Sequence, residues 1–296
     1  MRLITRPSLS GVACATFITS MENIEQVIFA NPHDIEDRSV EVKKGDVIAN
    51  LPYHPVVEMW FDNHDKAEEA PDAMPNVKGK RGVSRSTARL VYEYYNSPLL
   101  TKFDDLLAAT DKISSAELSL DEVVNPTGWV LLSFTLDPFM GLANFHGFAN
   151  TIIASLKNGQ TVEQILDMPD VKGRVNRYKL DAEDFKQDLA GISKLEENVI
   201  ISDYRGSEIL ATGNRFVGFS LYPEGNVQIV ITTDSKNDET RIRIGKSIFN
   251  HSCKVHLGHL ASEFGGGGLD GAAGFSLAHA DADNKVELLI DRLKGI

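Results

Sequence analysis

The segment MWFDNHDKAEE, residues 59–69, holds a transition from an apolar run to four consecutive polar side chains. The run VVEMWF (56–61) has the composition of a strand, and Asp62, Asn63, His64 and Asp65 follow it directly. Ligands of open α/β sheets bind at the carboxyl ends of the strands. Aspartate and histidine at such a position suit a divalent cation, a solvated turn is the alternative, and spacing alone leaves both open.

The residues around this segment alternate between strand-like and helical patterns. Apolar runs of strand length lie at 2–5, 26–30, 46–50 and 56–61. A helical pattern follows the first run, and another covers 84–95, with Ser84 or Ser86 as its N-cap. Strands that alternate with helices predict the α/β class with a parallel sheet, and further amphipathic segments up to residue 192 predict a helical portion after it.

The pattern changes near residue 196, where strand-like runs become dominant. They lie at 198–204, 215–222, 227–233 and 240–244, and the chain closes with one more strand and the helix 282–296. We place a domain boundary in the charged region at 190–205. The predicted domains are therefore 1–192 and 205–296.

Composition and charge narrow the classes of partner. The 296 residues include 42 acidic and 30 basic side chains, a net charge of −12, which argues against a general grip on DNA or RNA. We therefore expect no binding of long duplex nucleic acid, while a small phosphorylated ligand stays open. Two distant cysteines indicate no disulfide framework, and the N-terminal apolar piece is too short to span a bilayer. We expect a cytoplasmic protein with no membrane contact.

Two further segments carry polar or glycine-rich patterns at places suited to ligands. TRPSLSG (5–11) leaves the first predicted strand, so its side chains should reach the same sheet edge as Asp62. FGGGGLDGAAGF (264–275) lets backbone approach a ligand and turn N–H groups toward an anion. A flexible linker is the alternative, and the context of a dinucleotide fold or a P-loop is missing.

The segment NHSCKVHLGHL (250–260) brings together His251, Cys253, His256 and His259. Its spacing does not match that of a zinc site, because paired clusters of ligands are absent. We expect packing and capping histidines here.

Taken in order, TRPSLSGVACA, NLPYHP…WFDNHD, ATDKISSAEL and FGGGGLDGAAGF resemble the motifs of one family. This is the DHH/DHHA1 phosphoesterase family, in its exopolyphosphatase-related branch. The resemblance implies an N-terminal Rossmann-like parallel-sheet domain and a smaller, mixed α/β DHHA1 domain that holds the substrate. It also implies manganese or magnesium in the N-terminal domain, where cations activate water against a phosphoester or phosphoanhydride.

The resemblance also assigns the site residues. Asp62, His64 and Asp111 match catalytic positions, and Asp62 and Asp111 match metal ligands. Asn50 or Asp46 corresponds to a further aspartate motif. Contacts with the substrate fall on the following residues: Asn250, Ser252, Gly265, Gly266, Gly267 and Gly268.

Several positions depart from the family motifs. Ser8 and Ser10 replace two aspartates, Asn63 replaces the first histidine of the signature, and Leu269 replaces the histidine after the glycines. Even the loss of residues that support metal ligands typically costs about 10–100-fold in affinity, and losing the ligands themselves should cost more. We expect no two-manganese centre. Two alternatives are left. Either one weakly held ion binds Asp62 and Asp111, with Asp65 or Asp46 beside them, or no ion binds.

Three functions compete on this evidence. The first is a pseudoenzyme that binds a nucleotide or other phosphorylated ligand with little or no hydrolysis. The second is an active metal-dependent phosphoesterase, acting on short nucleotides or polyphosphate through a reduced site with His64 as general acid and base. The third is a structural or partner-binding role in which the site is vestigial. For the oligomeric state, the sequence is compatible with a homodimer.

Overall fold

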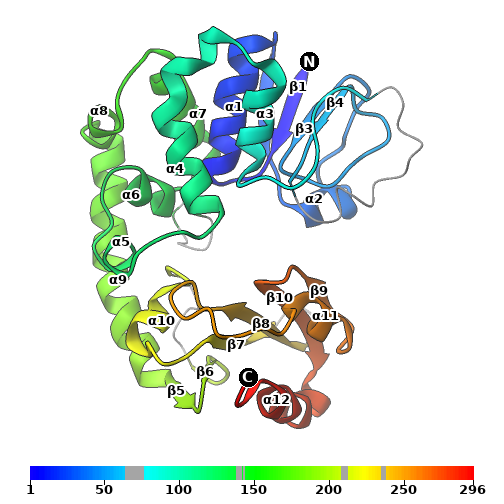
Figure 1. Cartoon of the computed structure of the whole chain (residues 1–296), viewed down its shortest axis with the longest axis vertical. Helices are drawn as coiled ribbons and strands as arrows, with labels where there is room; N and C mark the ends of the chain where they lie inside the picture. The colour runs from blue at the N-terminus through cyan, green and yellow to red at the C-terminus, as the bar shows by residue number, and fades with distance from the viewer. Residues whose placement is uncertain (64–76, 138–141, 143, 208–212, 235–237) are drawn as a thin grey trace. The chain divides into compact units, whose positions relative to one another are not determined.

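The computed structural model describes residues 1–63, 77–137, 142, 144–207, 213–234 and 238–296. The chain forms two compact units (Figure 1). The first joins Met1–Glu117 and Pro126–Tyr178, and the second joins Leu118–Asn125 and Lys179–Ile296. Domain limits at 1–192 and 205–296 stay a prediction from sequence pattern. No helix in the described residues combines the length and the apolar character needed to cross a membrane.

The first unit is built on a parallel sheet in the described residues, with strand order β2-β1-β3-β4. Its strands are β1 (Arg2–Thr5), β2 (Gln26–Phe29), β3 (Val47–Ala49) and β4 (Met59–Phe61). Each lies within a predicted run, so the parallel α/β sheet is confirmed. In the register of the sheet Thr5 pairs with Ala49, and Ala49 pairs with Phe61. The carboxyl ends of β1, β3 and β4 therefore lie at one edge.

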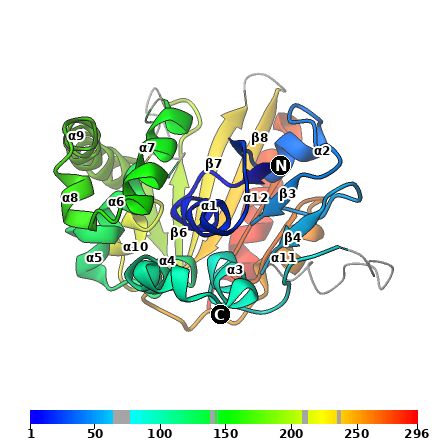
Figure 2. The ribbon, with the colours of Figure 1, turned by 90° about the horizontal axis from the view of Figure 1, so that it is seen from above.

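Helices cover this sheet because the apolar side chains of its strands point to both faces. Helix α1 is buried along most of its length, from Leu9 to Ile18, and lies against α3, α4 and α7 (Figure 2). Of the two predicted caps of α3, Ser86 is the one that accepts a hydrogen bond, from the N–H of Arg89. The other face carries a cluster around Ile4, Ile48 and Trp60. The helices of this unit are α1 (Leu9–Met21), α2 (Pro32–Glu36), α3 (Thr87–Tyr95), the 3₁₀ helix η2 (Pro98–Phe103), α4 (Asp104–Ser114), α6 (Gly128–Thr135), α7 (Phe145–Lys157), α8 (Val162–Leu166) and the first part of α9 (Pro169–Ile192).

The second unit contains a mixed sheet with order β5-β6-β7-β8-β10-β9 in the described residues. Only β6 and β7 are parallel neighbours, and the other pairs are antiparallel. The mixed α/β character that the resemblance implies is thereby confirmed. The elements are α5 (Leu120–Val124), β5 (Ser193–Glu196), β6 (Val199–Asp203), α10 (Val217–Leu221), β7 (Val227–Asp234), β8 (Glu239–Lys246), α11 (Leu257–Ser262), β9 (Gly267–Gly268), β10 (Ala272–Ala278) and α12 (His279–Leu293).

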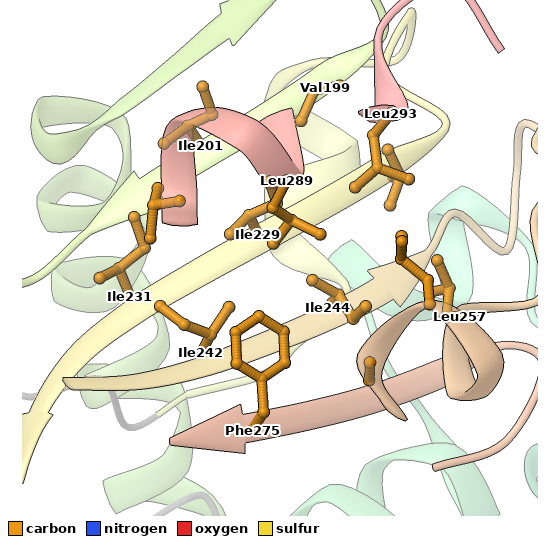
Figure 3. Packing of buried hydrophobic residues seen from close by; sticks show 14 of the residues in the cluster. Val199, Ile201, Ile229, Ile231, Ile242, Ile244, Leu257, Phe275, Leu289 and Leu293 are labelled. Atoms are coloured by element: carbon orange, nitrogen blue, oxygen red, sulfur yellow. The ribbon is translucent and has the colours of Figure 1, made fainter. Parts of the chain in front are cut away.

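One face of this mixed sheet forms the core of the second unit. Alternate side chains such as Ile229, Ile244 and Phe275 point toward Leu257 of α11 and Leu289 of α12 (Figure 3). The alternation places every second strand residue on this face, which explains why the period-2 pattern of the sequence predicted these strands.

One predicted strand is wrong. The run 215–222 contains the helix α10, in which the consecutive residues Val217, Gly218 and Phe219 are all buried. Gly218 lies close to β7, since a Cβ at this position would stand 2.6 Å from the side-chain amide of Gln228. The alternation of apolar residues at 215–222 is typical of a strand, but the segment forms a helical turn.

Candidate functional site

The carboxyl edge of the parallel sheet brings several of the predicted site residues together. Ser8 and Ser10 follow β1, Asn50 follows β3, and Asp62 and Asn63 follow β4. Because these three strands are neighbours in register, five positions distant in sequence lie at one edge. His64 and Asp65 lie outside the described residues.

Ser8 and Ser10 belong to the start of α1. Ser8 is the N-cap, and its Oγ accepts a hydrogen bond of 3.2 Å from the N–H of Gly11. Ser10 is buried and hydrogen-bonded to Cys14 in the next turn. Burial, followed by the charge of Asp62, raises the pKa of the Cys14 thiol, which stays neutral. Asp62 is only 4 % exposed, and its charge acts on Cys14 in the second turn of α1.

Asn63, at the position of the missing histidine, takes part in an amide and hydroxyl network. Thr87 Oγ1 donates to Asn63 Oδ1 at 2.6 Å and lies 3.3 Å from Asn50 Oδ1. The Asn63 amide nitrogen donates to the carbonyl of Ser84 at 3.0 Å. These bonds tie the end of β4 to the start of α3 with neutral groups.

Asp111 lies on α4 and is 1 % exposed. Ser86 Oγ donates to its Oδ1 at 2.6 Å, while Arg89 donates to its Oδ2 through Nε at 2.8 Å and through Nη2. The carboxylate is thus already neutralised by a guanidinium group. Arg89 was missed at the sequence level, because its partner Asp111 lies 22 positions away on another helix.

The structure separates Asp46 from this edge. Asp46 precedes β3, so it lies at the amino end of the strand, whereas Asn50 follows the carboxyl end. Its carboxylate accepts hydrogen bonds from Arg2 Nε at 2.9 Å and from the N–H of Lys43 at 2.7 Å. Asp46 therefore holds the start of β3, and Asn50 is the residue placed beside the candidate site.

The donor groups that the described residues supply at this edge do not fit a pair of divalent cations. In the described part of the chain no three side chains of His, Cys, Asp or Glu gather where an ion could bind. Magnesium and manganese favour carboxylate oxygens. Among the described residues Asp62 and Asp111 supply carboxylates here, Asp111 is already paired with Arg89, and the other groups are amides and hydroxyls.

The predicted substrate residues of the second unit already serve its own structure. Asn250 donates through its amide to the carbonyl of Glu224 and accepts from the N–H of Ser252, whose Oγ accepts from Asn226. The N–H groups of Gly265 and Gly266 donate to carbonyls of α11. A substrate role for these residues stays a prediction.

The glycine run also packs against backbone. A Cβ on Gly266 would overlap the carbonyl oxygen of Gly274 and Cβ of Phe275. Gly268 has φ +153° and pairs with Ala273. Gly267, in contrast, has nothing within 4 Å of its Cβ position. Close approach between β9 and β10 accounts for Gly266 and Gly268 without a ligand.

The histidine segment follows the expectation of packing and capping. His256 is the N-cap of α11, and its Nδ1 accepts from the N–H of His259 at 3.1 Å. The two imidazole rings stack with centroids 3.8 Å apart. Cys253 lies in the apolar cluster of the second unit.

Comparison with known proteins identifies the family. No family model matches the chain, and no curated protein sequence does. Among solved structures, it is similar to PggH from Vibrio cholerae, a pGpG-specific phosphodiesterase, with 31 % identity and a TM-score of 0.80 over 99 % of this chain and 98 % of that chain. The chain belongs to the DHH/DHHA1 phosphoesterase family.

More distant DHH/DHHA1 structures agree in fold. RecJ from Thermus thermophilus in complex with Mn²⁺ has a TM-score of 0.56 at 14 % identity, covering 98 % of this chain and 52 % of RecJ. The Mg²⁺ complex has a TM-score of 0.52 at 16 % identity, covering 98 % and 50 %. The chain therefore spans about half of RecJ, and at this identity the likeness concerns the fold alone.

Proposed function

We propose that this DHH/DHHA1 protein binds a short nucleotide or other small phosphorylated ligand and hydrolyses it little or not at all. The observation that carries the proposal is the pairing of Asp111 with Arg89 and Ser86. A carboxylate that already accepts a bidentate donor offers little attraction to a cation. A divalent ion at Asp111 would have to displace a guanidinium group and then stand next to it.

The other substitutions act in the same direction. Ser8 and Ser10 are neutral where carboxylates would attract a hard cation, and Asn63 is held in hydrogen bonds by Thr87 and Ser84. Without paired cations, the site lacks the usual means of lowering the pKa of water and neutralising a phosphoryl group in the transition state. At most one Mn²⁺ or Mg²⁺ ion would bind here, with low affinity.

The ligand class rests on similarity and on charge. PggH is described as specific for pGpG, and we take a dinucleotide of this kind as the first candidate ligand. The net charge of −12 disfavours long polyanions. Two buried free cysteines fit the proposed cytoplasmic location. The proposed function is compatible with a homodimer.

The test uses the full chain, pGpG and Mn²⁺. We expect calorimetry to detect pGpG binding in EDTA, with no Mn²⁺ binding at micromolar concentration and no release of GMP when Mn²⁺ is added. Turnover that requires Mn²⁺ would refute the proposal. The combined variant Ser8→Asp, Ser10→Asp, Asn63→His, Arg89→Gln should gain at least about 10–100-fold in Mn²⁺ affinity, because ligand charge returns and the competing cation is removed. The same variant with Asn at positions 8 and 10 is the neutral control.

An active phosphodiesterase with a reduced metal site is the second candidate. The 31 % identity to an enzyme named for pGpG hydrolysis favours it, as does the retained Asp62. In that case His64→Ala should abolish pGpG cleavage that the unaltered protein shows. Cleavage that survives this substitution would exclude His64 as the general acid and base.

A further inference from the structure

The first turn of α1 presents backbone N–H groups at the carboxyl edge of the sheet. The first N–H groups of any α-helix lack a carbonyl partner within the helix, and aligned peptide dipoles place about half a positive charge there. Ser8 Oγ accepts from Gly11, which leaves the N–H groups of Leu9 and Ser10 without an intrahelical carbonyl. This turn contains no acidic side chain, so nothing in it cancels the positive end of the dipole.

Thr5 supplies a second and independent feature at the same place. Its side chain is 0 % exposed, and Oγ1 has no hydrogen-bond partner among the described residues. This oxygen lies 3.1 Å from the point where a Cβ on Gly11 would stand, so it faces the first turn of α1. The same Cβ would overlap the carbonyl oxygen of Arg6, so only glycine fits beside the backbone that connects β1 to α1. Buried hydroxyl groups are normally paired, and this one, which has no partner among the described residues, has its bonding capacity available to a ligand.

From these observations we infer that the first turn of α1, with the hydroxyl groups of Thr5 and Ser8, binds a phosphate group. The inference rests on the proposed function and assigns a site to the phosphate of its ligand. Carboxylates at positions 8 and 10 would make this edge attractive to a cation. Hydroxyl groups at the positive end of a helix dipole reverse that preference, because the turn then offers N–H and O–H donors to an anion.

Asp62 is a buried carboxylate whose charge acts on the Cys14 thiol, and Cys14 is hydrogen-bonded to Ser10 one turn earlier in α1. This carboxylate limits the affinity for phosphate, since like charges repel. Substitution of Asp62 also tests whether the site prefers an anion or a cation. For an anion site Asp62→Asn should strengthen phosphate binding, whereas for a cation site the same change should weaken Mn²⁺ binding and leave phosphate unaffected.

The experiment measures inorganic phosphate and pGpG binding to the full chain by calorimetry in EDTA. Ser8→Asp should weaken phosphate binding by about tenfold or more, because a carboxylate then occupies the positive end of α1. Aspartate is as good an N-cap as serine, so the fold should be kept. Ser119→Asp is the matched control, since Ser119 is the N-cap of α5 in the second unit, and it should leave phosphate binding unchanged.

Thr5→Val adds a variant of nearly identical shape. We expect it to weaken phosphate binding several-fold and, without phosphate, to raise the melting temperature, because it removes a buried hydroxyl group that has no partner. Thr110→Val is its control. Thr110 Oγ1 donates to the carbonyl of Leu106, so that variant should melt at a lower temperature and bind phosphate normally.

The outcomes separate this inference from the proposed function. If pGpG is bound without turnover but Ser8→Asp and Thr5→Val bind phosphate as the unaltered protein does, the phosphate site is wrong and the proposed function stands. If Mn²⁺-dependent hydrolysis appears while both variants lose phosphate, the proposed function fails alone. Absence of phosphate and pGpG binding at millimolar concentration contradicts both. If pGpG binds and inorganic phosphate does not, the phosphate site is wrong and the protein recognises the nucleoside part of the ligand.

Discussion

At the scale of single residues, the pairing of Arg89 with Asp111 makes the sharpest prediction about stability. Removing one partner of a fully buried ion pair costs about 3–5 kcal/mol, because the other charge is left unpaired. Arg89 is one-third exposed, so we expect Arg89→Gln to lower the free energy of unfolding by about 2 kcal/mol. Urea denaturation at neutral pH measures this change.

A nearby arginine offers a matched control. Arg85 pairs with Glu117, and both side chains are more than half exposed. Pairs of this kind contribute about 0–1 kcal/mol, so Arg85→Gln should alter stability only slightly. Equal effects of the two substitutions would show that Asp111 does not depend on Arg89, and the argument against a cation at Asp111 would lose its basis.

The sequence allowed only part of this residue-scale picture to be predicted. The loss of two carboxylates at positions 8 and 10 and of an imidazole at position 63 was visible because each falls in a recognisable motif. The pairing of Asp111 was not, because it joins two helices across 22 positions and depends on their packing. The choice between Asp46 and Asn50 likewise required the bounds of β3, which place the two at opposite ends of one short strand.

At the scale of elements, the strands were easier to predict than the short helices. The parallel strands β1, β3 and β4 are largely buried apolar runs, and β7 and β8 of the second unit alternate with period 2, so both patterns are present in the sequence itself. Helix α10 was missed because its five residues are too few for a helical period to appear. Its buried residues include Gly218, which packs beside the Gln228 amide of β7, and the local sequence does not show this contact.

The glycine run gives a prediction at the same scale. Gly266→Ala should lower the free energy of unfolding by about 1–3 kcal/mol, because its Cβ would overlap backbone and Phe275 in β10. Gly267→Ala, in the next position, meets no atom within 4 Å and should change stability by about 0.5 kcal/mol or less. Urea denaturation of the two single variants compares them directly.

The same pair of variants tests what the run is for. If the glycines serve the packing of β9 on β10, only Gly266→Ala should be destabilised, and pGpG affinity should be equal in every variant that remains folded. A loss of pGpG affinity in Gly267→Ala at unchanged stability would instead support the anion cradle predicted from the sequence.

At the scale of the whole molecule, net charge and local donors act in opposite directions. A charge of −12 repels a polyanion at distances up to the Debye length, about 8 Å in physiological salt. A helix terminus and a few hydroxyl groups act only at contact distance. Together they favour a ligand with few phosphates over a long nucleic acid, a selection that neither property gives alone.

This balance predicts how binding depends on ligand length and on salt. We expect pGpG affinity to change by no more than about tenfold between 50 and 200 mM salt, because a dinucleotide releases few counterions. A 24-base-pair duplex should not bind at either salt concentration, and single strands of two, five and twenty nucleotides should bind progressively more weakly. Fluorescence anisotropy with labelled ligands measures each case. Duplex binding that falls about 10³-fold or more over this salt range would instead indicate many phosphate contacts on a basic surface, and it would contradict both the charge argument and the assignment of a small ligand.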